Sequence, residues 1–387
     1  MDKAGSGKAE EILKKLVTRI NEEHRTEAAL EAKRQGKKII GVVSPSVPEE
    51  IISAAGMFPW RIAGTWRGDV SRANIYRPVK TDLYCTHVLQ SLLDGGLDFL
   101  DGVVFAYWTD DIRRLWDIWI HLKKPSFAYM LYVPHKDSDQ ARSEFRGGIA
   151  RFMTALEEFG NVEISKQDLV KAVEVYNRWR TLLMRIYELR KREIPAIWGW
   201  ETLGITTASF VMPRDELNRE LEVLVDSLEN RRISGAPVWP RLMVCGEDID
   251  DPARLKLIED LEAVVAMDDL DTGSRYFWKT TEANGDPIYA LAKRYLACPS
   301  SPRNYEWSKY MDQVIEWVRD FNIDGILNLP GMYNYWRQTI TPYLVDRLTK
   351  YGIPVMTFST EYRVASVAQL QTRIQAFIET LRARRKP

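Results

Sequence analysis

The sequence predicts an α/β protein of two lobes, each built on a mainly parallel sheet, with a helical insert between them and helices at both termini. Two stretches, residues 38–137 and 235–387, alternate short apolar runs of strand length with longer amphipathic runs of helix length. Residues 138–234 between them have helical periodicity and many charges, as do residues 1–37. The 387 residues also exceed one ordinary core of about 100–200 residues.

Elements of the first lobe follow from its apolar runs and from residues that start and stop helices. Pro48 and Gly56 stand near the start and at the end of one run, and acidic residues open the run that begins at Asp110. Strands are predicted at Lys38–Ser44, Phe58–Ala63, Leu100–Tyr107 and Pro125–Val133, and helices at Glu10–Arg34, Val47–Gly56, Asp82–Leu93 and Asp110–Leu122. Because strands and helices alternate, we expect a Rossmann-like or flavodoxin-like lobe with both sheet faces covered.

The insert and the second lobe are assigned in the same way. Helices are predicted at Ser138–Phe159, Lys166–Lys191 and Pro213–Asn230, whereas Ile194–Met212, with its proline and tryptophans, is expected to be irregular. In the second lobe we expect strands at Arg241–Cys245, Ala263–Met267, Gly325–Leu329 and Val355–Phe358, and helices at Pro252–Leu261, Tyr305–Phe321 and Tyr335–Tyr351. A last helix carries one apolar face, made of Val367, Leu370, Ile374, Phe377 and Leu381.

Four loops are predicted to form the ligand site, because ligands of open α/β sheets bind beyond the carboxyl ends of the strands. These loops are Ser44–Pro48, Tyr107–Asp111, Gly246–Asp250 and Leu329–Trp336. In the first loop the Ser44 hydroxyl could face a ligand or serve the start of the next helix.

The composition excludes several classes of function. Lys+Arg and Asp+Glu both total 54, so the basic surplus of a nucleic-acid binder is missing. The apolar runs are far shorter than the ~20 residues of a membrane-spanning helix, and Met1–Leu16 lacks a signal-peptide core, so we expect a cytoplasmic protein. Cys85, Cys245 and Cys298 are too far apart for a disulfide framework, and the four histidines lack metal-ligand spacing.

Arg275 is the best candidate for binding an anionic group. It follows Gly273 and Ser274, where a guanidinium could hold a phosphate or carboxylate; it could equally pair with the aspartates of Asp268–Asp271. The sequence leaves both arrangements open. Gly-rich phosphate loops and the GxSxG and HExxH signatures do not occur in the sequence.

Short motifs in order along residues 38–380 resemble one family. They are Ser44–Gly56 with Pro59 (SPSVPEEIISAAGMFP), Cys85 on a helix, Leu100–Val103 (LDGV), Asp110–Leu115 (DDIRRL), Met267–Phe277 (MDDLDTGSRYF), Asp324–Ile326, Gly352–Val355 and Gln371–Glu379 (QTRIQAFIE). With them the chain resembles the 2-hydroxyacyl-CoA dehydratase / benzoyl-CoA reductase subunit family, the D-component of 2-hydroxyglutaryl-CoA dehydratase included.

The resemblance implies an enzyme subunit that pairs with a homologous but unequal sister subunit and binds an acyl-CoA thioester between two lobes. It implies a [4Fe–4S] cluster held by three cysteines, and a separate ATP-hydrolysing activator that supplies low-potential electrons. The implied reaction is either radical dehydration of a 2-hydroxyacyl-CoA or ring reduction of an aromatic acyl-CoA. Thirteen tryptophans slightly favour the aromatic substrate, although they could instead form the core or a subunit interface.

The chain departs from the family at the cluster ligands. Cys85 matches the first ligand position, but Thr109 stands at the second and Asn334 near the third. One thiolate cannot hold a cubane, so the resemblance places the cluster on the sister subunit unless Cys245 and Cys298 join Cys85. We expect Ser44, Thr109, Arg275 and Asn334 to contact substrate.

Three functions stay open. The first is a benzoyl-CoA reductase-like subunit that forms part of the acyl-CoA site beside a cluster-bearing sister. The second is a dehydratase subunit with its own cluster. The third is a non-catalytic, two-lobed binding or scaffold protein.

Overall fold

Two four-stranded sheets, in which all the paired strands run parallel, form the framework of the protein in the computed structural model. The structure describes residues 3–64, 68–233, 239–282, 285–297, 304–363 and 367–385. The first sheet has the order β2-β1-β3-β4, with β1 Ile39–Val43, β2 Phe58–Arg61, β3 Gly102–Tyr107 and β4 Ala128–Tyr132. The second has the order β6-β5-β7-β8, with β5 Arg241–Gly246, β6 Val264–Asp269, β7 Gly325–Leu329 and β8 Val355–Thr357. The predicted α/β class with two parallel sheets is confirmed.

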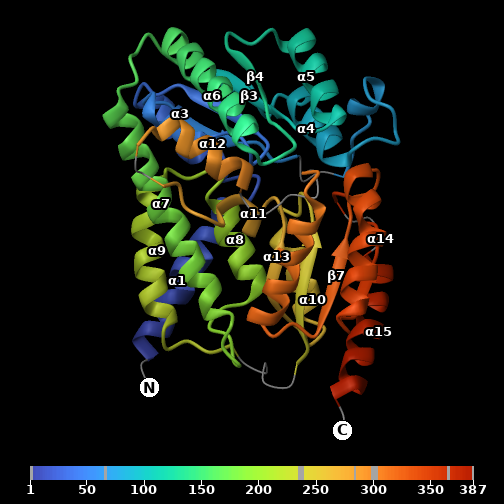
Figure 1. The fold of residues 1–387 in the computed structure, drawn as a ribbon. Helices are drawn as coiled ribbons and strands as arrows, with labels where there is room; N and C mark the ends of the chain where they lie inside the picture. The colour runs from blue at the N-terminus through green and yellow to red at the C-terminus, as the bar shows by residue number, and fades with distance from the viewer. Residues whose placement is uncertain are drawn as a thin grey trace.

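Helices cover both sheets (Figure 1). Around the first lie α2 Glu27–Arg34, α3 Glu49–Ala54, η1 Ala73–Ile75, α4 Leu83–Leu93, α5 Asp110–Lys123 and α6 Asp139–Gly160. Along one side run α1 Lys3–Arg19, α7 Lys166–Leu189, α8 Gly199–Ala208 and α9 Arg214–Leu228. The remaining helices are α10 Pro252–Glu259, α11 Ser274–Phe277, α12 Pro287–Ala297, α13 Trp307–Asp320, α14 Tyr335–Lys350 and α15 Val367–Arg385. Helix α12, which comes after β6 in the chain, packs against α6 beside the first sheet. The predicted domain boundaries stay predictions.

The single helix expected over Glu10–Arg34 is wrong, because the chain turns between α1 and α2. The backbone N–H groups of His24 and Arg25 both donate hydrogen bonds to the carbonyl of Asn21, which closes a turn. The turn also presents the Arg25 carbonyl to the indole N–H of the buried Trp60, at 3.1 Å. The turn between the two helices is thus tied to the first sheet by this contact.

The irregular segment expected over Ile194–Met212 is also wrong, since it contains helix α8. Nine of the ten residues of α8 are buried, polar ones included, so the helix has almost no exposed face and its sequence shows no amphipathic period. Gly199 is needed at its start, because a Cβ there would lie 2.7 Å from Cβ of Val265 on β6.

Glu259, at the end of α10, fixes α8 against the second sheet. Its carboxylate accepts bonds from the backbone N–H groups of Gly199 at 2.9 Å, Trp200 at 3.0 Å and Val265 at 3.1 Å. Burial raises the pKa of Glu259 to about 7, although these three donors pull it down.

We expect Glu259 to make stability depend on pH. Between the unfolded pKa of about 4.5 and the folded pKa of about 7, the folded state binds more protons, so this carboxyl lowers the free energy of unfolding as pH rises. The slope is at most about 1.4 kcal/mol per pH unit. Urea unfolding at several pH values should show that Glu259→Gln removes this slope. An identical pH dependence in both proteins would contradict the assignment.

Two adjacent buried glutamates join the first sheet to the helices around it. Glu49 accepts a bond from Arg214 on α9 at 2.7 Å, and Glu50 accepts from Arg180 on α7 and from the hydroxyl of Tyr295 on α12. Burial raises the pKa of Glu50, but Arg180 and Arg294 outweigh it, so that the net pKa is lowered. The start of α3 is therefore anchored from three other helices.

Candidate functional site

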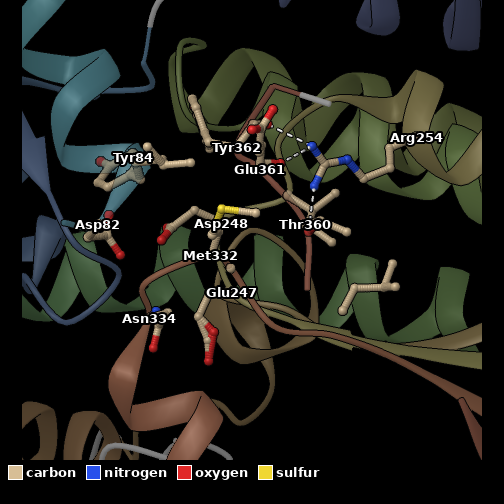
Figure 2. Close-up of a pocket in the computed structure, with 14 residues that line it drawn as sticks. Asp82, Tyr84, Glu247, Asp248, Arg254, Met332, Asn334, Thr360, Glu361 and Tyr362 are labelled. Atoms are coloured by element: carbon tan, nitrogen blue, oxygen red, sulfur yellow. Dashed lines mark hydrogen bonds between the residues drawn. The ribbon is translucent and has the colours of Figure 1, made fainter. Parts of the chain in front are cut away.

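The carboxyl ends of the two sheets face each other across two adjoining hollows. The first has about 360 Å³ of empty space, open solvent at its mouth included, and is lined by residues that follow β5, β7 and β8, together with the start of α4 (Figure 2). The second has about 310 Å³ of such space and is lined by residues that follow β1, β3 and β6. Asp82, Tyr84 and Asp248 line both, so we treat the two hollows as one cleft. The loops predicted to form the ligand site contribute to this cleft, and its use as the site stays a prediction.

Cys85 lies in the first turn of α4 and lines the second hollow. Its backbone N–H donates to the capping carboxylate of Asp82 at 3.1 Å. Burial raises the pKa of the Cys85 thiol well above its usual value, the Asp82 charge raises it further, and Arg77 opposes both. These surroundings favour the neutral thiol over the thiolate.

Thr109 also lines the second hollow, as the N-cap of α5. Its hydroxyl oxygen accepts a bond from the backbone N–H of Ile112 at 3.3 Å. The neighbouring Trp108 donates its indole N–H to the hydroxyl of Ser46, which ties the loop after β3 to the loop after β1. The Thr109 side chain thus caps a helix beside the cleft.

Asn334 lines the first hollow and caps α14. Its carbonyl oxygen accepts from the backbone N–H of Arg337 at 3.1 Å. The buried Arg337 guanidinium in turn donates to Asn328 on β7 at 3.2 Å and to Asp269 on β6 at 3.2 Å. Sequence reasoning missed Arg337 and Asn328, because a buried arginine inside a helix gives no motif.

Ser44 lines the second hollow in an unusual backbone conformation, with a φ of 94°. Residues other than glycine adopt such a φ at a cost of order 1–3 kcal/mol. The buried Ser44 hydroxyl oxygen accepts a bond from the backbone N–H of Ser46 at 3.3 Å. The loop after β1 is thereby folded tightly under the cleft.

Arg275 does not line either hollow. Its buried guanidinium donates to Asp271 at 3.0 Å, to Asp269 at 3.1 Å and to the carbonyl of Gly246. This is the pairing with neighbouring aspartates that the sequence left open. Asp271 does line the second hollow, so Arg275 supports the cleft from behind, and a role in coenzyme binding stays a prediction.

Carboxylates dominate the polar lining of the cleft. Asp82, Glu247, Asp248 and Asn334 surround the first hollow in Figure 2. Arg254 is also present, but its guanidinium donates to the carbonyls of Glu361 and Tyr362 at 2.8 and 2.7 Å. Part of this negative charge is compensated, because Arg275 lies 3.8 Å from Glu247 and 3.0 Å from Asp271.

Comparison with known sequences identifies the family. Residues 46–381 match the family described as 2-hydroxyglutaryl-CoA dehydratase, D-component. The chain belongs to this family. It is 24% identical to the (R)-phenyllactyl-CoA dehydratase beta subunit of Clostridium sporogenes, across 89% of this chain and 92% of that one. It is 26% identical to the (R)-2-hydroxyglutaryl-CoA dehydratase beta subunit of Acidaminococcus fermentans, across 90% and 94%. It is 23% identical to one of the subunits of benzoyl-CoA reductase from Thauera aromatica, across 89% and 91%.

The side chains at the family's expected cluster positions do not fit an iron–sulfur cluster. Cys85, Thr109 and Asn334 offer a buried thiol, a hydroxyl and an amide, and the last two cap helices. Within the described ranges, no group of three His, Cys, Asp or Glu side chains could hold a metal ion. Cys245 is buried in β5, and burial raises its pKa to about 12, while Cys298 lies outside the described residues. A cluster that uses Cys245 and Cys298 is therefore untested.

The tryptophans give little support to an aromatic substrate. Trp60, Trp119, Trp179 and Trp317 are buried in the core. Among the residues whose positions are described, no tryptophan lines either hollow. Core packing accounts for these side chains.

In the part of the chain that the structure describes, no helix is both long enough and apolar enough to cross a membrane.

Proposed function

We propose that this chain is a cluster-free subunit of an ATP-dependent complex that delivers low-potential electrons to an acyl-CoA thioester. In this proposal a homologous sister subunit holds the [4Fe–4S] cluster, and a separate ATP-hydrolysing activator reduces it. The observation that carries the proposal is the side-chain set at Cys85, Thr109 and Asn334. At the family's expected ligand positions, this chain has two helix caps and one buried thiol.

The acyl end of the substrate, rather than the coenzyme, is the part proposed to enter this cleft. The two hollows hold room for water-sized molecules of only about 30 and 10 Å³, far below the roughly 300–1,000 Å³ of ligand pockets, so the cleft has to widen to admit an acyl group. The bulkier coenzyme would then stay outside. Ser44, Thr109 and Asn334 lie on the cleft, where they would form one wall around the thioester and keep water from a reactive intermediate.

Two reactions are candidates. Dehydration of a 2-hydroxyacyl-CoA is supported by the names of the relatives from Clostridium sporogenes and Acidaminococcus fermentans. Ring reduction of an aromatic acyl-CoA, which the tryptophan count favoured, is supported by the Thauera aromatica relative. Because the described tryptophans do not line the cleft, we place dehydration first and benzoyl-CoA reductase-like chemistry second.

The assembled complex of this chain, its sister and the activator tests the function. Incubated with ATP and a low-potential reductant, it should remove water from a 2-hydroxyacyl-CoA, or reduce benzoyl-CoA if the second candidate holds. The sister and activator without this chain should be inactive, because one wall of the thioester site is missing. Equal turnover without this chain would leave only the scaffold function.

Cys85→Ala tests whether this chain carries the cluster in the complex. We expect the iron content of the assembled complex to stay unchanged, because Thr109 and Asn334 at the other two expected ligand positions leave Cys85 without partner thiolates. The variant should lose only about 1 kcal/mol of stability, the cost of a small cavity. The matched control replaces a cluster cysteine of the sister subunit and should remove the iron. Loss of about four irons with Cys85→Ala would place the cluster here.

A further inference from the structure

Four aromatic side chains meet beside the cleft and join the two halves of the chain. The ring of His135, which follows β4, lies 5.2 Å from that of Trp108, 5.5 Å from that of Tyr305 and 5.7 Å from that of Trp336. His135 and Trp336 are stacked, with an interplanar angle of 14°. Trp108 immediately precedes Thr109, and Trp336 lies two residues after Asn334. The cluster therefore adjoins two of the loops that line the cleft, those that follow β3 and β7.

Exposed tyrosines extend this cluster. Tyr132 is 67% exposed and pairs with Tyr107, the neighbour of Trp108. Tyr305 and Tyr335 are 64% and 60% exposed. Further along α14, Tyr343 is 59% exposed and pairs with Trp307. We call these residues the aromatic rim: Tyr107, Trp108, Tyr132, His135, Tyr305, Trp307, Tyr335, Trp336 and Tyr343.

The size of the rim fits a protein interface. An aromatic side chain buries about 150–250 Å² when covered, so the four exposed tyrosines alone offer roughly 500 Å². A standard interface covers about 800 Å² on each partner. Tyrosine and tryptophan are also the residues enriched at interface centres, which polar residues surround. Asp137 and Glu306, adjacent in sequence to the rim, supply such a border through ion pairs with Arg142 and Lys309.

We propose that the aromatic rim is the surface on which the sister subunit docks; this rests on the proposed function. The relatives are themselves named as subunits, so a partner chain is expected. A protein covering the rim lies next to Thr109 and Asn334, and therefore against the mouth of the cleft. From there a cluster-bearing sister reaches the thioester that this chain holds. The rings of Trp108, His135, Tyr305 and Trp336 pack against one another, so no gap is left between them in which a planar ligand could stack. The rim therefore suits a protein surface better than a small aromatic ligand.

The double variant Tyr132→Ser/Tyr305→Ser tests the rim. Both side chains are mostly exposed, so the fold should be retained, which circular dichroism and thermal melting check. The matched control is Tyr351→Ser, which removes a 51% exposed tyrosine at the far end of α14. The affinity of each variant for the purified sister subunit is measured by titration calorimetry, with the mass of each complex determined by sedimentation.

We expect the rim variant to bind the sister at least about tenfold more weakly, and the Tyr351 variant to bind like wild type. Unchanged affinity of the rim variant would overturn the proposal while leaving the proposed function standing. If the wild-type chain does not bind the sister, the proposed function fails instead. If the chain alone forms dimers that the rim variant abolishes, a second copy covers the rim, and the sister is the wrong occupant.

Discussion

A chain in which Thr109 and Asn334 are both replaced by cysteine is expected to gain an iron–sulfur cluster. Cys85 and Thr109 line the same hollow, and Asn334 lines the adjoining one, so the variant presents three thiols around a single cleft. Three thiolates are the ligand set that the family resemblance implies. After anaerobic reconstitution with iron and sulfide we expect about four irons per chain, measured together with the visible absorption of a cubane.

The control for this variant is Thr109→Ser/Asn334→Asp. Serine and aspartate keep the N-caps of α5 and α14, so this chain should fold normally and bind no cluster. The double cysteine variant loses two caps, at about 1 kcal/mol each, and its folding should be checked by circular dichroism. A folded double cysteine variant without iron would show that Thr109 and Asn334 do not stand at ligand positions.

Arg180→Leu is expected to lower the free energy of unfolding by roughly 3–5 kcal/mol, because it leaves the buried Glu50 without its main counter-charge. Both side chains are at most 1% exposed. In the double variant Arg180→Leu/Glu50→Leu, both charges are removed together, so it should lose much less stability than Arg180→Leu.

Two residues earlier on α7, Arg178 pairs with Glu222 at the surface and provides the matched control. Its side chain is 62% exposed, so Arg178→Leu should cost less than about 1 kcal/mol. Urea unfolding of the variants measures each loss. Equal small losses for Arg178→Leu and Arg180→Leu would show that the pair with Glu50 does not anchor the start of α3.

The sequence predicted the sheets better than the helical parts. Buried parallel strands such as Ile39–Val43 are continuous apolar runs bounded by loops, and this signal survives in the sequence alone. Helix α8 left no signal, because a helix buried on nearly all sides has almost no exposed face to mark its period. The turn between α1 and α2 is tied to Trp60, a contact distant in sequence that local patterns do not contain.

The sequence placed three of its four candidate residues on one cleft, while their supporting contacts were not predicted and their role in binding stays a prediction. Ser44, Thr109 and Asn334 lie on the cleft because strand-end loops must gather there in parallel sheets. The sequence allowed Arg275 either to bind a ligand or to pair with the neighbouring aspartates. In the structure its guanidinium donates to Asp269 and Asp271. Local sequence cannot decide this, since the choice depends on whether the second sheet brings those carboxylates within reach.

The iron and acid-labile sulfide content of the wild-type chain, purified alone without oxygen, tests the central claim most directly. The claim is that this chain forms part of an acyl-CoA site and that the cluster lies on another subunit. We predict far less than one iron per chain and no cubane absorption. Of the three expected ligand positions, only the first has a cysteine, Cys85, while Thr109 and Asn334 occupy the other two. About four irons and four sulfides per chain, with a cubane spectrum, would contradict the claim and make this subunit itself the electron carrier.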